Sequence, residues 1–367
     1  MKMTKAVFAL YFLCTAALLA SQSIGTVEYC EGRVSVIRDG KRIARVDMGF
    51  SVENLDQVCC EANSTVSLAF LPSSGITGTL TLSEKSSAII RRDQLQTKTS
   101  NDIFLLGGEV SLKVKRLGGA DSSIRVRTTT SVLGVRGTEF NAATFYGNSL
   151  VACREGEVYC YAYSDITGIQ GSPLNGMSAV PGRMVAIPES GVIASADFPE
   201  GDYFEQWDDL RNRWKSYHVE MISADPVVLL DRLASSWDTA LDRVLRDAAQ
   251  LRKNETASRW LESARRGGDA GTRQAWVTER PQVMKDMLAM RPHLVLATIP
   301  WLRIQDLVTL VRKEDMDRTL SDGQTVRAFI RQFDRNSRDF SAAMHLFYAL
   351  EKQYMLRNDG LSPFMDF

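Results

Sequence analysis

The chain has 367 residues, with 44 Lys or Arg balanced by 44 Asp or Glu, so its formal net charge is zero. This balance provides no field that would attract nucleic acid or an anionic membrane surface, and we expect neither as a partner. The length predicts two folding units. All six tryptophans follow residue 200 and five of the six cysteines lie between residues 30 and 160, so the two units differ in composition.

The first 23 residues have the composition of an export signal. Lys2 and Lys5 precede an apolar run at 6–20, AVFALYFLCTAALLA, which is short for a membrane span and typical of a cleaved secretory signal. We therefore predict a signal peptide at 1–23 and an exported, periplasmic protein. An uncleaved anchor is the alternative and would be its only attachment to a membrane. Lipid attachment at Cys14 is disfavoured because Leu13 stands where a small residue is needed.

Residues 24–192 are predicted to be all-β. Alternating runs bounded by turn residues indicate strands near 25–32, 33–38, 41–46, 65–71, 76–82, 87–91, 103–106, 109–116, 150–153, 158–162 and 180–187. Asp39-Gly40 is a strong hairpin signal between two of them. Many short strands with frequent turn signals favour a sandwich or roll.

The stretch at 124–140, IRVRTTTSVLGVRGTEF, is a strand interrupted by Gly134 and Gly137. Glycines at this spacing mark bulges or places where another backbone approaches closely. Arg136 lies among apolar neighbours and needs an acceptor, for which Glu139 is the nearest candidate. We expect a structural strand with a locking ion pair rather than a ligand site.

This stretch resembles the signature of the FecR-type domain family, Thr-Pro-x-Ala/Ser-x-x-x-Val-Arg-Gly-Thr-x-Phe. The matching residues are Thr129, Ser131, Val135, Arg136, Gly137, Thr138 and Phe140, while Thr130 replaces the usual proline. Other landmarks of the family follow in the same order: Gly25, Val27, Gly32, Val34 and Val36, then Leu106, Gly108 and Val110, then Glu155, Gly156 and Val158, and finally Gly182. The resemblance covers 24–192 and implies a FecR-like β domain in which Val135, Arg136, Gly137, Thr138 and Phe140 are structural.

The best-known members of that family span the inner membrane and carry signals from a loaded outer-membrane transporter to a cytoplasmic sigma factor. The resemblance therefore implies a role in signal transduction. Only Met1 to Lys5 precede the apolar segment, so we expect no sigma-binding domain of the chain's own. A relay through another membrane protein stays open.

The cysteines allow one specific disulfide. If Gly156 and Glu157 formed a two-residue hairpin turn, Cys153 and Cys160 would face each other across the two strands. Buried apolar thiols are the alternative. Export makes disulfides possible, but Cys30, Cys59, Cys60, Cys153 and Cys160 are an odd number, so at least one stays unpaired.

A linker is expected at 193–201, followed by an all-α helical bundle of unrecognised family at 202–367. Asp225-Pro226 is a typical helix start, and apolar residues then recur at helical spacing. Further helices are expected near 255–266, 272–290, 304–312 and 325–356, separated by Gly267-Gly268, Pro292, Pro300 and Asp322-Gly323. The tryptophan and leucine stripes are most simply the bundle core, with a partner-binding groove as the alternative.

No motif for catalysis, a cofactor or a metal is recognisable in the sequence. The three histidines, His218, His293 and His345, lie far apart. We therefore expect no catalytic, cofactor-binding or metal-ligating residues. The predicted function is that of a non-catalytic exported protein of the cell envelope whose β domain binds a partner protein or envelope component. The alternative is a periplasmic signal-transduction regulator that acts through a membrane partner.

Overall fold

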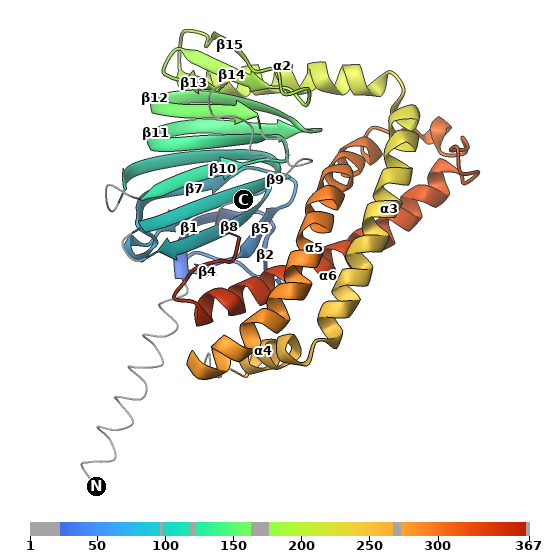
Figure 1. The fold of residues 1–367 in the computed structure, drawn as a ribbon. Coiled ribbons are helices and arrows are strands. Elements are labelled where there is room, and N and C mark those ends of the chain that lie inside the picture. Colours follow the sequence, from blue (N-terminus) through green and yellow to red (C-terminus); the bar gives the residue numbers. More distant parts are fainter. Residues whose placement is uncertain (1–22, 96–97, 118–121, 163–175, 267–272, 365–367) are drawn as a thin grey trace.

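The computed structural model describes residues 23–95, 98–117, 122–162, 176–266 and 273–364. The predicted signal peptide lies outside this part of the chain, apart from Ser23, which begins the first strand. The strands form one body, and the helices pack against it (Figure 1). Within the described residues no helix is both long and apolar enough to cross a membrane.

The strands of the N-terminal region join in one 15-stranded sheet. They are β1 (Ser23–Glu31), β2 (Val34–Arg38), β3 (Lys41–Ile43), β4 (Ser51–Glu53), β5 (Asp56–Cys60), β6 (Thr65–Phe70), β7 (Ile76–Leu82), β8 (Ser87–Leu95), β9 (Lys98–Leu117), β10 (Ser123–Arg127), β11 (Ser131–Phe145), β12 (Asn148–Ala162), β13 (Met177–Ala179), β14 (Arg183–Ile187) and β15 (Ala194–Asp197).

Three long strands divide this sheet into two layers. The later part of β9 pairs with β7 and with the later part of β11, whereas the earlier part of β9 pairs with β8 and β10. Layer A therefore contains β1, β4, β6, β7, β14, β15 and one part each of β9, β11 and β12. Layer B contains β2, β3, β5, β8, β10, β13 and the remaining parts of the three long strands.

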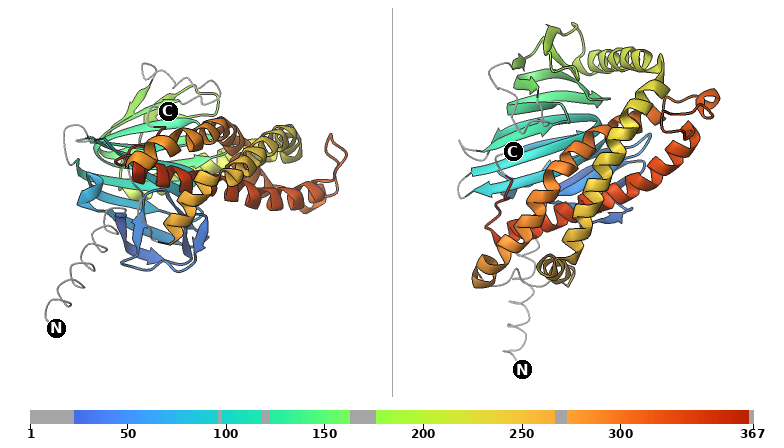
Figure 2. Two further views of the ribbon diagram at one scale, coloured as in Figure 1. Left: turned by 60° about the horizontal axis from the view of Figure 1, so that its bottom comes forward. Right: turned by 45° about the vertical axis from the view of Figure 1, so that its right-hand side comes forward.

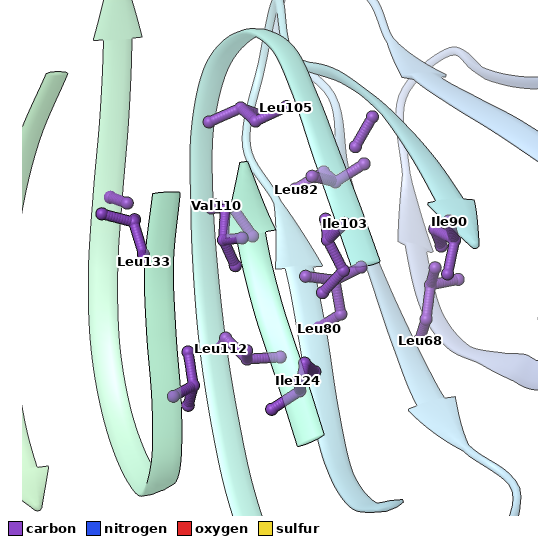
Figure 3. Close-up of a cluster of buried hydrophobic side chains, with 14 of the residues drawn as sticks. Leu68, Leu80, Leu82, Ile90, Ile103, Leu105, Val110, Leu112, Ile124 and Leu133 are labelled. Atoms are coloured by element: carbon purple, nitrogen blue, oxygen red, sulfur yellow. The ribbon is translucent and has the colours of Figure 1, made fainter. Parts of the chain in front are cut away.

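Glycines form the corners where the long strands pass from one layer to the other. Gly108, Gly137 and Gly156 have φ angles of 86°, 60° and 84°, a region that L side chains rarely adopt. The ribbon of β9 turns over between Leu105 and Val110 (Figure 3). The sequence prediction of a hairpin at Gly156 is wrong, because both halves of β12 continue along β11 instead of pairing with each other.

The core of the β region lies between the two layers. Leu80, Val110 and Leu112 of layer A and Ile90 and Ile103 of layer B belong to one buried apolar cluster (Figure 3). β7 alternates buried and more exposed residues, as the period of two requires, whereas Ala88, Ile89 and Ile90 of β8 are all buried because the helices cover its outer face. The β sandwich or roll predicted for the N-terminal region is confirmed.

The described C-terminal region is helical. It contains α2 (Tyr203–Ser223), α3 (Pro226–Lys253), α4 (Glu255–Arg265), α5 (Arg273–Val308) and α6 (Val326–Arg357). Side chains cap four of the helices at the N-terminus: Asp202 accepts from two backbone amides of α2, and Asp225, Asn254 and Thr325 each accept from one amide of α3, α4 and α6. The predicted helical fold class is therefore confirmed.

Helix α5 corrects the prediction of helix ends at two prolines. It runs continuously through Pro281, Pro292 and Pro300. Proline removes one backbone donor and bends a helix, but it does not interrupt an apolar face. Met290, Leu294, Ala297, Trp301 and Ile304 keep helical spacing across both prolines and are buried in the bundle. Tertiary packing therefore holds the helix together.

The helices are joined to the β region without a long free linker. The segment expected as a linker, 193–201, contains β15, which pairs with β14. After it, α2 passes over layer A, and α5 and α6 lie along layer B (Figures 1 and 2). Trp207 of α2 is buried against Ala143, Leu150 and Ala152, so this tryptophan belongs to the contact with the sheet and not to the bundle core.

The predicted disulfide between Cys153 and Cys160 is absent. Both residues lie on the single strand β12, where Cys153 is opposite Phe140 and Cys160 opposite Leu133. The described cysteines all have free thiols, and these two are buried. The expectation was wrong because it required the hairpin at Gly156. The alternative, small buried thiols, is what the structure has.

Chemical labelling should confirm the free thiols. Burial raises the pKa of Cys160 to about 12 and that of Cys153 to about 11, so maleimide should react slowly with both in the native protein. In denaturant without reductant, each cysteine should take up one maleimide, as read by peptide mass spectrometry. A reduced sample is the control. A linked peptide pair containing both residues would contradict the structure.

Candidate functional site

The surface between the helices and the outer face of layer B combines apolar and charged groups. Along β8, Ala88 and Ile90 point into the sandwich core, whereas Ile89 and Arg91 point outward to the helices. Ile89 packs with Leu55, Leu106 and Met355 of α6 in a small buried cluster that joins the two regions. Because side chains alternate along a strand, Arg91 lies on the same outer face as Ile89, and a charged residue therefore adjoins the apolar contact.

Two arginines and an aspartate form a row across three neighbouring strands. Arg91 of β8 and Arg125 of β10 are each directly opposite Asp102 of β9. Arg125 binds Asp102 through two hydrogen bonds, Nε–Oδ1 at 2.7 Å and Nη2–Oδ2 at 3.0 Å. This fork geometry is the strong arrangement for an arginine and a carboxylate. Two residues further along the same strands, Arg127 of β10 is opposite Phe104 of β9.

Arg91 connects the sheet to the C-terminal end of α6. Its Nε lies 2.9 Å from Asp93 and its Nη2 lies 3.2 Å from Glu351. The hydroxyl of Ser362 donates to Glu351 at 2.5 Å, and the Ser362 amide donates to Asp93. Burial acts to lower the pKa of Arg91, but the Glu351 and Asp93 carboxylates outweigh it and raise the pKa above its ordinary value.

A cavity of about 140 Å³ lies between this row and the helices. Strands and the turn after β10 supply one wall, and α5, α6 and the segment after α6 supply the other. Its lining residues are Leu55, Ile89, Arg91, Asp102, Phe104, Arg127, Thr128, Thr129, Arg291, Leu294, Val295, Thr298, Ile299, Met344, Phe347, Tyr348, Glu351 and Phe364. The cavity is therefore shared by both folding units.

Tyr348 marks the polar end of the cavity. Burial and, to a lesser extent, the Glu351 carboxylate raise the pKa of its phenol to about 12. Arg91, Arg127 and Arg291 act in the opposite direction, which places three guanidinium groups in the electrostatic surroundings of this phenol. Tyr348 therefore stays neutral and can donate or accept a hydrogen bond there.

A second charged cluster fastens α6 to layer B. The Lys352 ammonium lies 2.7 Å from Glu53, which in turn accepts from Arg38 at 2.7 Å. Arg38 also binds Asp56, with Nη2–Oδ2 at 2.6 Å. Lys352 and Asp56 are both buried. Ions that are removed from water require such partners, so this chain of contacts fixes where α6 lies on the sheet.

A third contact joins α5 to the turn between β11 and β12. The Tyr146 amide donates to Asp306 at 2.7 Å, and Arg303 pairs with Glu189 at 2.6 Å. Arg303 also lies over the Tyr146 ring, 5.8 Å from its centroid. The helices are thus held at three separated places.

Asp306 should make stability depend on pH. Burial raises its pKa to about 6, so the folded protein binds a proton more readily than the unfolded chain between roughly pH 4 and 6. The contribution of this group to stability is therefore lost as the pH rises through that window. Asp306→Asn keeps an acceptor for the Tyr146 amide, and we expect it to raise the free energy of unfolding at pH 7.5 by about 1–3 kcal/mol.

Urea unfolding at pH 4.5 and 7.5 would measure this difference. At pH 7.5 the free energy of unfolding of the variant should exceed that of the original protein. At pH 4.5 the two values should be nearly equal. Asp317→Asn, at an aspartate whose side chain is 81% exposed, is the control. An equal effect of Asp306→Asn at both pH values would exclude a raised pKa as the cause.

The predicted signature residues lie mostly away from the cavity, at the corner of β11. Val135, Thr138 and Phe140 are buried, Phe140 completely, and Gly137 has the positive φ angle of the corner. The side chain of Arg136 lies outside the described part of the structure. Glu139, its expected partner, accepts from Lys113 at 2.7 Å and from Arg154 at 2.9 Å. The structural role of these residues stays a prediction.

The cavity residues were missed by sequence reasoning, although one signal was available. On β10, Arg125 and Arg127 alternate with Ile124 and Val126, and on β8 the charged residues Arg91 to Asp93 directly follow an apolar run. A charged outer face that is also buried needs a cover, and the helices are that cover. Among the signature residues whose side chains the structure describes, Thr129 alone lines the cavity.

The described side chains do not indicate a metal or cofactor site. Among the described residues no three His, Cys, Asp or Glu side chains come together in a way that could hold a metal ion. The carboxylates beside the cavity are engaged by arginines instead. The arrangement can bind and orient a ligand through guanidinium groups and an apolar wall.

Comparison with known proteins identifies part of the β region. Residues 61–159 match the family described as FecR protein. Two crystal structures of "a putative anti-sigma factor" from Parabacteroides distasonis ATCC 8503 are similar at 16% and 14% identity, with TM-scores of 0.29 and 0.24. Each comparison covers 38% of this chain and 59% of the other. No curated protein matches the chain. Residues 61–159 therefore resemble a FecR-type domain, and they include β9, β11, most of β12 and the three glycine corners.

Proposed function

We propose that this protein is a non-catalytic signal-transduction protein of the cell envelope. It is exported to the periplasm, and its FecR-type domain binds a partner protein or envelope component. The signal passes through a membrane partner. The observation that carries this proposal is the match of residues 61–159 to the FecR family.

The interface between sheet and helices supports a role in recognition rather than hydrolysis. Asp102 is held by Arg125, and Glu351 by Arg91 and Ser362. A hydrolase that uses two carboxylates needs one of them protonated and poised over a substrate, whereas these are locked in ion pairs. A ligand-dependent change in the position of α6 would be a suitable signal.

Deletion of the gene in its native cells tests the proposal. The prediction is a change in the transcripts of a limited set of genes, restored by the full chain. A version that lacks residues 1–22 and is made in the cytoplasm should not restore them, because the partner would lie across the membrane. Unchanged transcripts would remove the signalling role. Restoration by the cytoplasmic version would remove the export requirement.

A further inference from the structure

We propose that the cavity between layer B and helices α5 and α6 binds a small neutral molecule with an apolar body and one hydroxyl group, an aryl or short-chain alkyl alcohol. The bound molecule contacts the sheet and the helices at once, and therefore favours the docked position of the helices. This inference rests on the proposed function and deepens it by naming the chemical class that the protein senses.

The volume of the cavity limits the size of the ligand. It is about 140 Å³, close to the volume of about 150 Å³ of an engineered apolar cavity that binds benzene in another protein. One ring or a chain of about six carbons therefore fits. A nucleotide, a sugar polymer or a peptide is too large.

The helical wall of the cavity contacts the body of the ligand. It consists of apolar side chains, namely Leu294, Val295 and Ile299 of α5 and Met344 and Phe347 of α6. Side chains that line an unfilled space lack the dispersion contacts that close packing provides, so a molecule that fills the space restores them. A ring or an alkyl chain placed there also removes apolar surface from water.

The charged groups around the cavity already have partners, so the ligand is neutral. Asp102 accepts two hydrogen bonds from Arg125, and the Arg91 guanidinium lies 2.9 Å from Asp93 and 3.2 Å from Glu351. The other two arginines of the lining also have interaction partners. A charged ligand would leave water without gaining a free counter-ion, which is strongly unfavourable. A neutral molecule avoids that cost.

The phenol of Tyr348 provides a hydrogen-bonding partner for a hydroxyl group on the ligand. Tyr348 lines the cavity and is half-buried, and among the described residues its hydroxyl makes no hydrogen bond. Because its pKa is raised to about 12, it stays protonated at neutral pH and can both donate and accept. An alcohol can do the same, whereas a hydrocarbon of equal size would leave the phenol unpaired.

Binding to the full chain should be measured by calorimetry and thermal unfolding. Benzyl alcohol and hexanol are the probes, toluene lacks the hydroxyl group, and benzoate and benzylamine carry a charge at pH 7. We expect the alcohols and toluene to bind and to raise the unfolding temperature. Benzoate and benzylamine should bind at least about tenfold more weakly than benzyl alcohol. Hydrogen exchange should slow in β8 and α6 together when benzyl alcohol is present.

Tyr348→Phe tests the hydrogen bond to the ligand. The change removes one hydroxyl group and keeps the ring, so the cavity wall keeps its shape. We expect benzyl alcohol to bind about three- to tenfold more weakly, and toluene to bind as before. The control is Tyr217→Phe in α2, at a tyrosine that is 59% exposed and does not line the cavity, which should change neither affinity.

Val295→Phe tests the position of the apolar body. The larger side chain fills the cavity from α5 and should weaken the binding of benzyl alcohol and of toluene alike, by about tenfold or more. The control is Leu296→Phe, at the next residue of α5, which is 38% exposed and does not line the cavity.

Two results would overturn the assigned ligand class: benzoate that binds as tightly as benzyl alcohol, or an equal effect of Tyr348→Phe on benzyl alcohol and toluene. Failure of both alcohols to bind, or unchanged binding in Val295→Phe, would overturn the site itself, while leaving the transcript test of the proposed function unaffected. Alcohol binding in a protein whose deletion leaves transcripts unchanged would keep the site and remove the signalling role.

Discussion

Gly156→Ala is expected to lower the free energy of unfolding by roughly 3 kcal/mol or more. Gly156 has a φ angle of 84°, at which an L side chain is strained. A Cβ atom there would also lie 2.5 Å from the backbone oxygen of Gly137 and 2.7 Å from a methyl group of Thr138. Backbone cannot move aside as a flexible side chain can, so the corner where β11 and β12 change layers must shift.

Gly137→Ala is the matched control at the other strand of the same corner. Its φ angle is 60°, but a Cβ atom there would meet nothing within 4 Å. Only the conformational strain remains, and we expect a loss of about 1–2 kcal/mol. The free energies of unfolding of both variants, measured in urea, separate the cost of backbone strain from the cost of steric overlap. Equal losses would show that close approach of the two backbones is not what requires glycine at residue 156.

Asp56→Ala is expected to cost about 3–5 kcal/mol of the free energy of unfolding, because it leaves a charge without its partner in the interior. Asp56 is 0% exposed. It accepts from Arg38 Nε at 3.0 Å, from Arg38 Nη2 at 2.6 Å and from the Glu53 amide at 2.8 Å. Glu53 also holds Lys352, so the loss should extend to the docking of α6.

Asp197→Ala is the control for an ion pair on the surface. Asp197 lies 3.3 Å from Arg183, but its side chain is 91% exposed. Such pairs contribute about 0–1 kcal/mol, so this variant should unfold almost as the original protein does. Hydrogen exchange of α6 should quicken in Asp56→Ala and stay unchanged in Asp197→Ala. Undisturbed exchange of α6 in both variants would show that the Lys352–Glu53–Arg38–Asp56 chain does not fasten the helix.

The docking of the helices on the sheet connects these experiments to function. The helices do not form a separate body beside the FecR-type domain, since Lys352, Glu351 and Asp306 tie them to the sheet at three places. Any variant that loosens α6 should therefore also change how the sheet and the helices respond to a partner that binds the docked state.

The sequence by itself determined the features that depend only on residues close along the chain. Alternation of apolar residues predicts the strands, and the Asp225-Pro226 pair predicts the start of α3, because a cap needs only the first turn of its own helix. The FecR landmarks lie in chain order and could be read directly. Gly137 was predicted to mark a bulge or a close backbone approach, and it is a corner of β11.

Only the tertiary structure decided the features that depend on distant residues. Gly156 could begin a hairpin or a corner, and the choice was made by β11, which pairs with both halves of β12. Pro292 and Pro300 did not end α5, because apolar contacts with the bundle outweigh the lost backbone hydrogen bonds. The cavity joins residues from 55 to 364 of the chain. Local sequence sets strand and helix periods, whereas the meeting of such distant groups depends on packing free energy summed over the whole molecule.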